Sequence, residues 1–147
     1  YRYGDSLVQG RAGSPANKYE PGKRPMSTMA PTMVFNANKE LMLITGSPGG
    51  STIPASILRV ISGVIDFNLD IGAATMLPRV HKDWPYKGLD YETTISNDTL
   101  SILNNLGHKL EPDRTIGSTQ SIHIVNGMNY GYSDLRRPGA SVAIQKN

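Results

Sequence analysis

Residues 46–52, which read GSPGGST, join an apolar run to a stretch of helical spacing. Gly49 and Gly50 stand where that helix would begin, so their backbone could approach a ligand closely. The first N–H groups of a helix lack intrahelical partners, and the helix dipole favours negative charge there. The junction therefore predicts a site for a phosphate, a carboxylate or the oxyanion of a tetrahedral intermediate. The alternative is an ordinary glycine-rich turn, and the pattern alone favours that alternative.

Two adjacent hydroxyl groups form a second candidate. Ser27 and Thr28 lie between Met26 and Met29, and a proline stands close on either side. Hydroxyls held in such a frame could donate hydrogen bonds to a carboxylate. Taken alone, the pattern favours the simpler interpretation that these residues begin a strand.

The other titratable residues indicate structural roles. His81, His108 and His123 show no i, i+4 pairing, and the chain has no cysteine, so we expect neither a metal nor a cofactor. His123 lies in an alternating stretch, and His81 is expected to pack in the interior rather than line a pocket. Asp134 is expected to form an ion pair near the C-terminus with either Arg136 or Arg137.

Composition excludes several classes of protein. The chain has 147 residues, of which 38% are apolar and 18% charged, which fits one folded domain. No apolar run reaches the roughly 18–20 residues of a membrane span. The net charge is only +3, and the basic residues are scattered along the sequence without forming a basic stripe with interleaved aromatic residues. We therefore expect no membrane span in this chain and no nucleic-acid partner.

The candidate residues are positioned by elements that periodicity predicts. Residues 1–25, rich in glycine and proline, predict a loop or extended segment that packs on the rest or on a partner. The apolar runs at 33–35 and 41–45 predict a β-hairpin. A largely buried helix is expected after 46–52, with Ser51 or Thr52 as N-cap and an end near Asn68.

The second half of the chain predicts further short elements. A helix capped by Asp70 is expected through Met76, followed by a strand over 88–93. A further helix, capped by Ser96 or Asn97, is expected to end at Gly107, and a strand is expected around 108–110. A second hairpin, with strands at 121–125 and 128–132, would turn at an Asn-Gly pair. The order ββ-α-α-β-α-β-ββ indicates the α+β class, with helices packed on a sheet.

Five segments together resemble a known family. They read KRPMSTMAPT at 23–32, TGSPGGS at 45–51, ATMLPRVH at 74–81, GSTQS at 117–121 and YGYSDLR at 130–136. Each is weak alone, but in this order they resemble the C-terminal part of the small subunit of γ-glutamyltransferases (γ-glutamyltranspeptidases). The chain departs from the family at Thr28, where serine is usual, and at Leu135, where proline is usual.

The resemblance implies a role for each candidate. Residues 26–147 would be the C-terminal part of the small-subunit catalytic domain, within the four-layer αββα sandwich of N-terminal-nucleophile hydrolases. Such enzymes cleave γ-glutamyl amides with a threonine nucleophile that autoproteolysis exposes, and they pass the acyl group to water, amino acids or peptides. Ser27 and Thr28 would bind the α-carboxylate of the γ-glutamyl group. The N–H groups of Gly49 and Gly50 would form the oxyanion hole.

The resemblance also implies what this chain needs. The family's catalytic threonine lies before the matched segments, so no nucleophile is expected here and the chain alone is expected to be inactive. The implied partners are a large subunit, the missing N-terminal part of the small subunit and a γ-glutamyl substrate such as glutathione. An exposed sheet edge could also support self-association. The family implies a periplasmic or extracellular location.

Two alternatives to a γ-glutamyltransferase remain open. The first is a related acylase, such as a cephalosporin acylase or a poly-γ-glutamate processing enzyme. The second is a non-catalytic remnant or interaction module that keeps the same fold.

Overall fold

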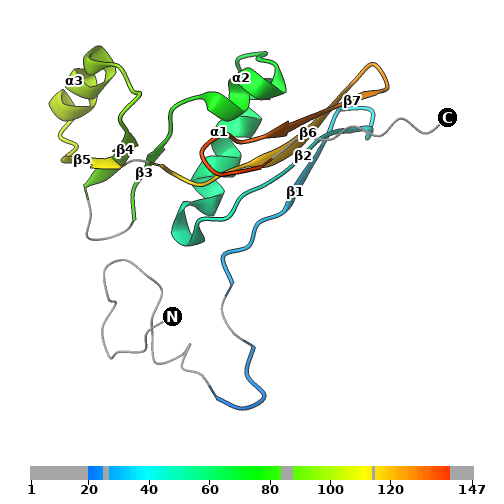
Figure 1. Cartoon of the computed structure of the whole chain (residues 1–147), viewed down its shortest axis with the longest axis horizontal. Helices are drawn as coiled ribbons and strands as arrows, with labels where there is room; N and C mark the ends of the chain where they lie inside the picture. The colour runs from blue at the N-terminus through cyan, green and yellow to red at the C-terminus, as the bar shows by residue number, and fades with distance from the viewer. Residues whose placement is uncertain (1–19, 25–26, 84–87, 114, 140–147) are drawn as a thin grey trace.

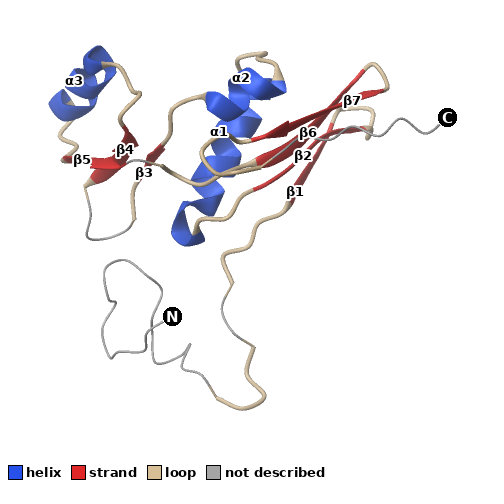
Figure 2. Ribbon diagram, in the orientation of Figure 1, coloured by secondary structure: helices blue, strands red, loops and turns tan. Residues whose placement is uncertain are grey.

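The computed structural model describes residues 20–24, 27–83, 88–113 and 115–139, and Figures 1 and 2 show its elements. In chain order these are β1 (Thr32–Phe35), β2 (Leu41–Gly46), the 3₁₀ turn η2 (Gly50–Thr52), α1 (Ile53–Ile65), α2 (Ile71–Met76), β3 (Val80–His81), β4 (Leu89–Glu92), α3 (Asn97–Asn105), β5 (Leu110–Asp113), β6 (Gln120–Val125) and β7 (Met128–Ser133). The segment predicted as a loop over residues 1–25 lies mostly outside the described residues.

The larger sheet has the strand order β1-β2-β6-β7, and its neighbouring strands are antiparallel. Both predicted hairpins are present, and β6 joins the second hairpin to the first by pairing with β2. The turn between β6 and β7 has positive φ at Asn126 (51°) and Gly127 (75°), which only a type I′ turn requires at both central residues. The Asn-Gly prediction is confirmed.

Helices α1 and α2 lie against one face of this sheet (Figure 1). Their apolar side chains close the core with Leu43 of β2, and its other buried members are Val60, Val64, Ile71 and Ala74. The two helices approach closely because α1 has glycine at position 63. A Cβ there would lie 2.8 Å from the Cβ of Ala74.

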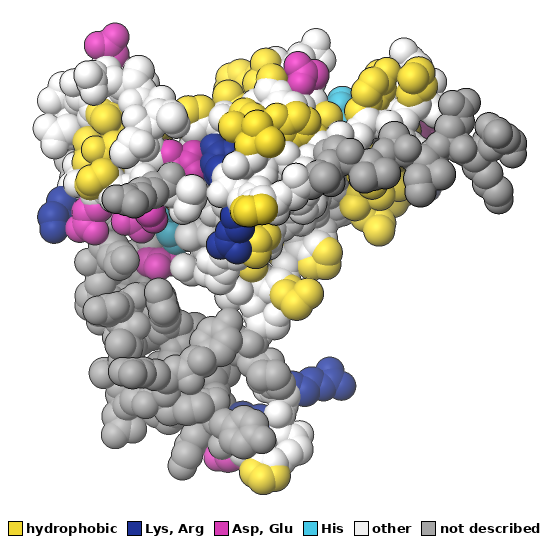
Figure 3. Space-filling view, viewed as in Figure 1, with side chains coloured by type: hydrophobic (Ala, Val, Ile, Leu, Met, Phe, Trp, Pro, Cys, Tyr) yellow, Lys and Arg dark blue, Asp and Glu magenta, His cyan; other side chains and the backbone are white. Residues whose placement is uncertain are grey.

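The opposite face of the same sheet carries apolar side chains at the surface. Met33, Ile44 and Ile122 are paired across β1, β2 and β6, so they share one row of that face. Met33 is 63% exposed and Ile122 is 41% exposed. Hydrophobic side chains that reach the surface are visible in Figure 3. Strands β1 and β7 are the two edges of the sheet.

The smaller sheet has the order β3-β4-β5, with α3 connecting the parallel strands β4 and β5. The sequence did not predict β3, which is only two residues long. The strand expected around 108–110 lies instead at Leu110–Asp113. Both differences arise because this sheet is built from very short strands, whose apolar pattern is brief.

The helix ends follow the capping signals. The side chain of Asp70 accepts a hydrogen bond from the N–H of Ala73, and Ser96 caps α3 in the same way. Gly107 follows α3 with φ at 87°. Thr52 holds the N-cap position of α1, but its side chain makes no capping bond. None of the helices in the described part of the chain is long and apolar enough to cross a membrane.

Candidate functional site

Four chain segments leave the larger sheet at the same end. Thr32 at the start of β1 pairs with Thr45 near the end of β2, and Gly46 pairs with Gln120 at the start of β6. Gln120 also pairs with Ser133, the last residue of β7. The segments before β1, after β2, before β6 and after β7 therefore all begin or end here. Both candidate pairs from the sequence lie on them.

The glycine turn presents two backbone donors at the start of α1. Gly49 has φ at 141° and Gly50 has φ at 61°, values that glycine adopts readily. The carbonyl of Gly49 accepts from the N–H of Thr52 at 3.2 Å and from its Oγ1 at 3.1 Å. No described residue accepts a hydrogen bond from the N–H of Gly49 or Gly50. Both glycines are exposed, so these donors are open to an anion.

The two hydroxyl residues precede β1 at this same end of the sheet. Ser27 is exposed and Thr28 is half-buried. The Oγ of Ser27 accepts a hydrogen bond from the N–H of Met29 at 3.1 Å, which leaves its own O–H able to donate. No hydrogen bond within the described residues joins this segment to the glycine turn. The structure thus places the two candidate pairs at one end of the sheet without linking them directly.

A serine pair secures the chain just before the turn. The Oγ of Ser47 accepts a hydrogen bond from the N–H of Ser118 at 3.0 Å and donates to the carbonyl of Pro48 at 2.8 Å. Gly117 has φ at 70° and packs tightly, because a Cβ there would lie 2.8 Å from the Oγ of Ser47 and would also meet Ser56. The segment before β6 therefore lies directly against the segment after β2.

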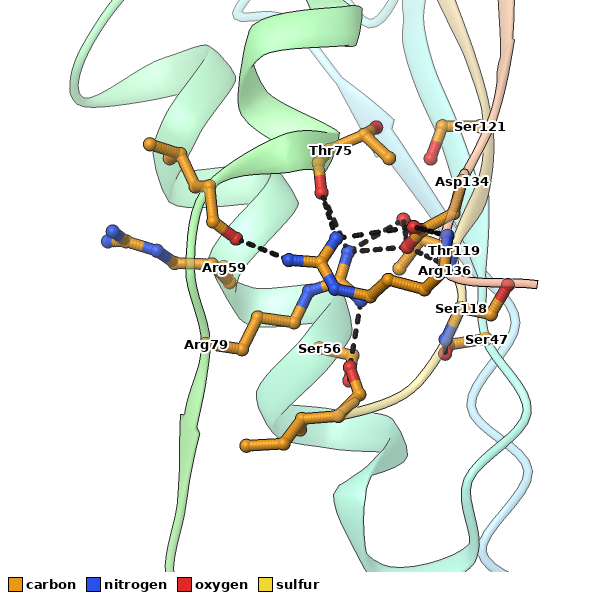
Figure 4. A network of polar contacts seen from close by, with 12 residues as sticks. Ser47, Ser56, Arg59, Thr75, Arg79, Ser118, Thr119, Ser121, Asp134 and Arg136 are labelled. Atoms are coloured by element: carbon orange, nitrogen blue, oxygen red, sulfur yellow. Dashed lines mark hydrogen bonds and ion pairs between the residues drawn. The ribbon is translucent and has the colours of Figure 1, made fainter. Parts of the chain in front are cut away.

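A buried network of four charged side chains reaches this end of the sheet through Asp134, which follows β7. Figure 4 shows three of them, Arg79, Asp134 and Arg136. Asp134 accepts from Arg79 at 2.8 Å and from Arg136 at 3.2 Å. Glu92 accepts from Arg136 at 2.6 Å and from the backbone N–H groups of Arg79 and Ile116. Two cations and two anions balance within the network, so no buried charge is left unpaired.

The surroundings shift the ionisation of three of these groups. Burial raises the pKa of Asp134, but the N–H groups of Arg136 and Thr119 and the Arg79 guanidinium outweigh it and hold the pKa below its usual value. Burial and then the nearby charge of Arg136 lower the pKa of Arg79. Burial also opposes the charge of Arg136, yet its bonds to Glu92 raise the pKa overall.

The sequence predicted only one contact of this network. The expected ion pair of Asp134 is confirmed with Arg136, whereas Arg137 is exposed. Arg79 and Glu92 were missed. Arg79 stands in the otherwise apolar stretch MLPRV, and a lone cation in such a stretch is the signal that could have identified a buried, paired arginine.

Other features lie apart from the candidate residues. His81 is buried, as expected, and His123 lies in β6. A groove of about 620 Å³ runs between α1 and α3, and its lining includes Leu58, Arg59 and Leu103. None of the predicted site residues lines this groove. The described residues contain no group of three His, Asp or Glu side chains that could hold a metal ion.

Comparison with known proteins decides the family. The sequence model of gamma-glutamyltranspeptidase matches residues 4–144. The chain belongs to the gamma-glutamyltranspeptidase family. It is 42% identical over 130 residues to the glutathione hydrolase proenzyme of Escherichia coli (strain K12), covering 88% of this chain and 22% of the relative. The chain thus spans about a fifth of that relative's length.

Solved structures of the family agree with this fold. A gamma-glutamyltranspeptidase from Pseudomonas nitroreducens, complexed with L-DON, superimposes with a TM-score of 0.84 at 31% identity, covering 99% of this chain and 77% of that one. A Helicobacter pylori gamma-glutamyltranspeptidase variant gives 0.82 at 35% identity, covering 93% and 76%. The predicted α+β class and N-terminal-nucleophile hydrolase fold are confirmed.

Proposed function

We propose that this chain forms part of a γ-glutamyltransferase, in which it supplies the oxyanion hole and the α-carboxylate site. One observation carries the proposal. The N–H groups of Gly49 and Gly50 have no protein partner in the described chain, and they lie at the end of the sheet that Ser27 and Thr28 precede. A γ-glutamyl amide has a carbonyl that becomes an oxyanion and a free α-carboxylate. The two N–H groups can stabilise the oxyanion, and the two hydroxyls can bind the carboxylate.

The proposed reaction begins with a threonine from outside this chain. Its hydroxyl oxygen attacks the γ-carbonyl carbon, and its α-amine takes the proton. The carbonyl oxygen becomes an oxyanion, which the N–H groups of Gly49 and Gly50 stabilise. The C–N bond then breaks, and the leaving amine takes the proton from the base. Water or an acceptor amine attacks the resulting γ-glutamyl ester, releases the product and restores the hydroxyl.

The hydroxyls of Ser27 and Thr28 would fix the donor substrate. Each can donate one hydrogen bond to the α-carboxylate, and a bond to a charged group contributes about 1.5–3 kcal/mol. Holding the carboxylate at this end of the sheet would place the γ-carbonyl over the glycine turn. Thr28, which is half-buried, keeps the donor and adds a methyl group.

The surface of the chain supports partners as well. The row of Met33, Ile44 and Ile122, of which Ile44 is half-buried and the other two are exposed, is a sheet face without a covering layer in the described residues. A second sheet from the N-terminal part of the small subunit would bury it, as in the four-layer sandwich that we propose. The proenzyme names of the relatives support a large subunit as the other partner. We propose a periplasmic or extracellular location for the assembly, which the resemblance to this family supports.

An exchange experiment tests the proposal. In the assembled enzyme, this chain replaces the matching segment of the Escherichia coli glutathione hydrolase proenzyme. The assembled enzyme is expected to hydrolyse γ-glutamyl-p-nitroanilide, whereas the purified 147-residue chain alone is expected to be inactive. An assembled enzyme that matures but does not turn over this substrate would contradict the proposal.

The same preparation separates the alternatives. Faster cleavage of a cephalosporin side-chain amide or of poly-γ-glutamate than of γ-glutamyl-p-nitroanilide would favour a related acylase. Correct maturation with no activity on any of these substrates would favour a non-catalytic module.

A further inference from the structure

Asp83 connects a buried imidazole to the glycine turn. Its Oδ1 lies 2.8 Å from the Nε2 of His81, and its Oδ2 accepts a hydrogen bond from the Oγ of Ser51 at 3.2 Å. The side chains of His81 and Asp83 are only 9% and 13% exposed. Ser51 directly follows Gly50, so the carboxylate reaches the residue next to the two proposed oxyanion donors.

The turn needs such an anchor. Glycine adopts positive φ about as readily as negative φ, so Gly49 and Gly50 have little intrinsic preference for the backbone conformation observed here. Thr52, the N-cap residue of α1, binds the carbonyl of Gly49 but makes no side-chain capping bond, so the helix end holds the turn only through that carbonyl. Ser47 is tied to Ser118 before the glycines, and Ser51 is tied to Asp83 after them. These two bonds bracket the turn and link it to different parts of the chain.

The bond from Ser51 to Asp83 joins two distant parts of the chain, and His81 orients the carboxylate that accepts it. Asp83 follows β3 and is 32 residues from Ser51 in sequence. His81 is the last residue of β3, and its ring holds one carboxylate oxygen so that the other faces Ser51. A carboxylate oriented from one side restricts the Ser51 side chain more than a freely rotating group would.

We propose that Asp83 is a positioning residue, which holds the Gly49–Gly50 turn in its oxyanion-binding conformation through Ser51. Asp83 does not touch the substrate in this account. The proposal rests on the function proposed above. Because electrostatic stabilisation depends on donors that are already in place, loosening the turn lowers the rate of acylation more than it weakens substrate binding.

Kinetics of the assembled enzyme test the contact from both sides. Asp83→Ala and Ser51→Ala are each expected to lower kcat for γ-glutamyl-p-nitroanilide about tenfold, with KM within about twofold. The double variant is expected to be no slower than either single variant, because both remove the same bond. Asp83→Asn keeps an amide of the same size, either end of which can bond to the Ser51 hydroxyl, and is expected to recover most of kcat. Lys82→Ala, an exposed neighbour, is the matched control.

Additive losses in the double variant, or a change confined to KM, would overturn the proposal. If Asp83→Ala does not fold, Ser51→Ala decides the test, because it removes the same bond and little volume. A Ser51→Ala variant that keeps the parent kcat would overturn the proposal. The Lys82→Ala control is expected to retain kcat within about twofold, which excludes a general effect of altered charge beside β3.

A readout without turnover separates this proposal from the proposed function. In the ¹⁵N-glycine-labelled chain, the order parameters of the Gly49 and Gly50 amides are expected to fall from about 0.85 to below about 0.6 in Asp83→Ala and Ser51→Ala. Unchanged order parameters would overturn the positioning role. Lowered order parameters together with an inactive parent assembled enzyme would support the anchor and contradict the γ-glutamyltransferase function instead.

Discussion

Nη2 of Arg79 lies 2.8 Å from Oδ2 of Asp134, and the two side chains are 1% and 0% exposed. The pair joins Arg79, which follows α2 and Pro78, to Asp134, which follows β7. Asp134 also accepts from the N–H of Thr119, which leads into β6. This one carboxylate therefore fixes three segments behind the end of the sheet that carries the proposed site.

Removing Arg79 is expected to destabilise the chain strongly. Arg79→Leu leaves Asp134 with less compensation in the interior, and breaking a buried pair in this way costs about 3–5 kcal/mol. Urea unfolding of the chain measures the change in the free energy of unfolding. Arg137→Leu, on an exposed arginine of the same region, is the control and is expected to change it by less than about 0.5 kcal/mol. Equal effects of the two substitutions would contradict a structural role for the Arg79–Asp134 pair.

Acid is expected to weaken the fold through Asp134. The pKa of Asp134 is lower in the folded chain than its usual value, so its contribution is fully present above the unfolded pKa of about 3.9. That contribution is lost as pH falls from there through the folded pKa. Thermal unfolding between about pH 6 and pH 2 measures it. Asp134→Asn is expected to flatten this part of the curve, and an unchanged slope would argue against the depressed pKa.

The glycine turn is expected to tolerate a methyl group for folding but not for catalysis. Apart from its chain neighbours Gly49 and Ser51, no described residue has an atom within 4 Å of a Cβ built on Gly50, whose φ is 61°. Gly50→Ala should cost only about 1–2 kcal/mol of stability, while its methyl group is expected to crowd the proposed oxyanion site. Steady-state kinetics of the assembled enzyme are expected to show kcat lowered at least about tenfold, because losing one oxyanion donor costs about 10²–10³.

Gly107 offers a matched control for that substitution. It has φ at 87° and equally open space around its Cβ, but it lies at the end of α3. Gly107→Ala should lose similar stability and keep kcat. An equal loss of kcat in both variants would mean that the effect is a general backbone cost rather than crowding of the oxyanion site.

The isolated chain is expected to associate. Its exposed sheet face offers apolar surface, and within the described residues no further strand pairs with the edge strands β1 and β7. Light scattering at high concentration should therefore give a mass above that of a monomer, and Met33→Lys with Ile122→Lys should lower it. Ile102→Lys, 60% exposed on α3, is the control. A clean monomer of the parent chain would count against this prediction.

Local patterns predicted most elements of this fold, because each carries a short-range signal. Asp70 and Ser96 mark helix starts, and Asn126 with Gly127 marks a hairpin. Neither the pairing of β2 with β6 nor the parallel pairing of β4 with β5 could be predicted in this way. Such pairings depend on contacts between residues far apart in sequence, and periodicity contains no information about them.

The residues of the candidate site also differ in whether a local sequence signal marks them. Gly49 and Gly50 were found from the sequence because the start of a helix has a local signature. Arg79 and Glu92 were not, since their partners lie 55 and 44 residues away and each residue alone resembles a surface charge. The tie between Ser51 and Asp83 is equally non-local. Whether Ser27 and Thr28 bind a carboxylate stays a prediction.

The most direct test of the proposed γ-glutamyl site compares two substrates of the assembled enzyme. γ-Glutamyl-p-nitroanilide carries the α-carboxylate, and 4-aminobutanoyl-p-nitroanilide lacks only that group. Loss of one charged hydrogen bond predicts that Ser27→Ala raises KM for the first substrate about tenfold or more and leaves the kinetics of the second unchanged. Unaltered KM and kcat for γ-glutamyl-p-nitroanilide in Ser27→Ala would remove Ser27 from the site and contradict the account.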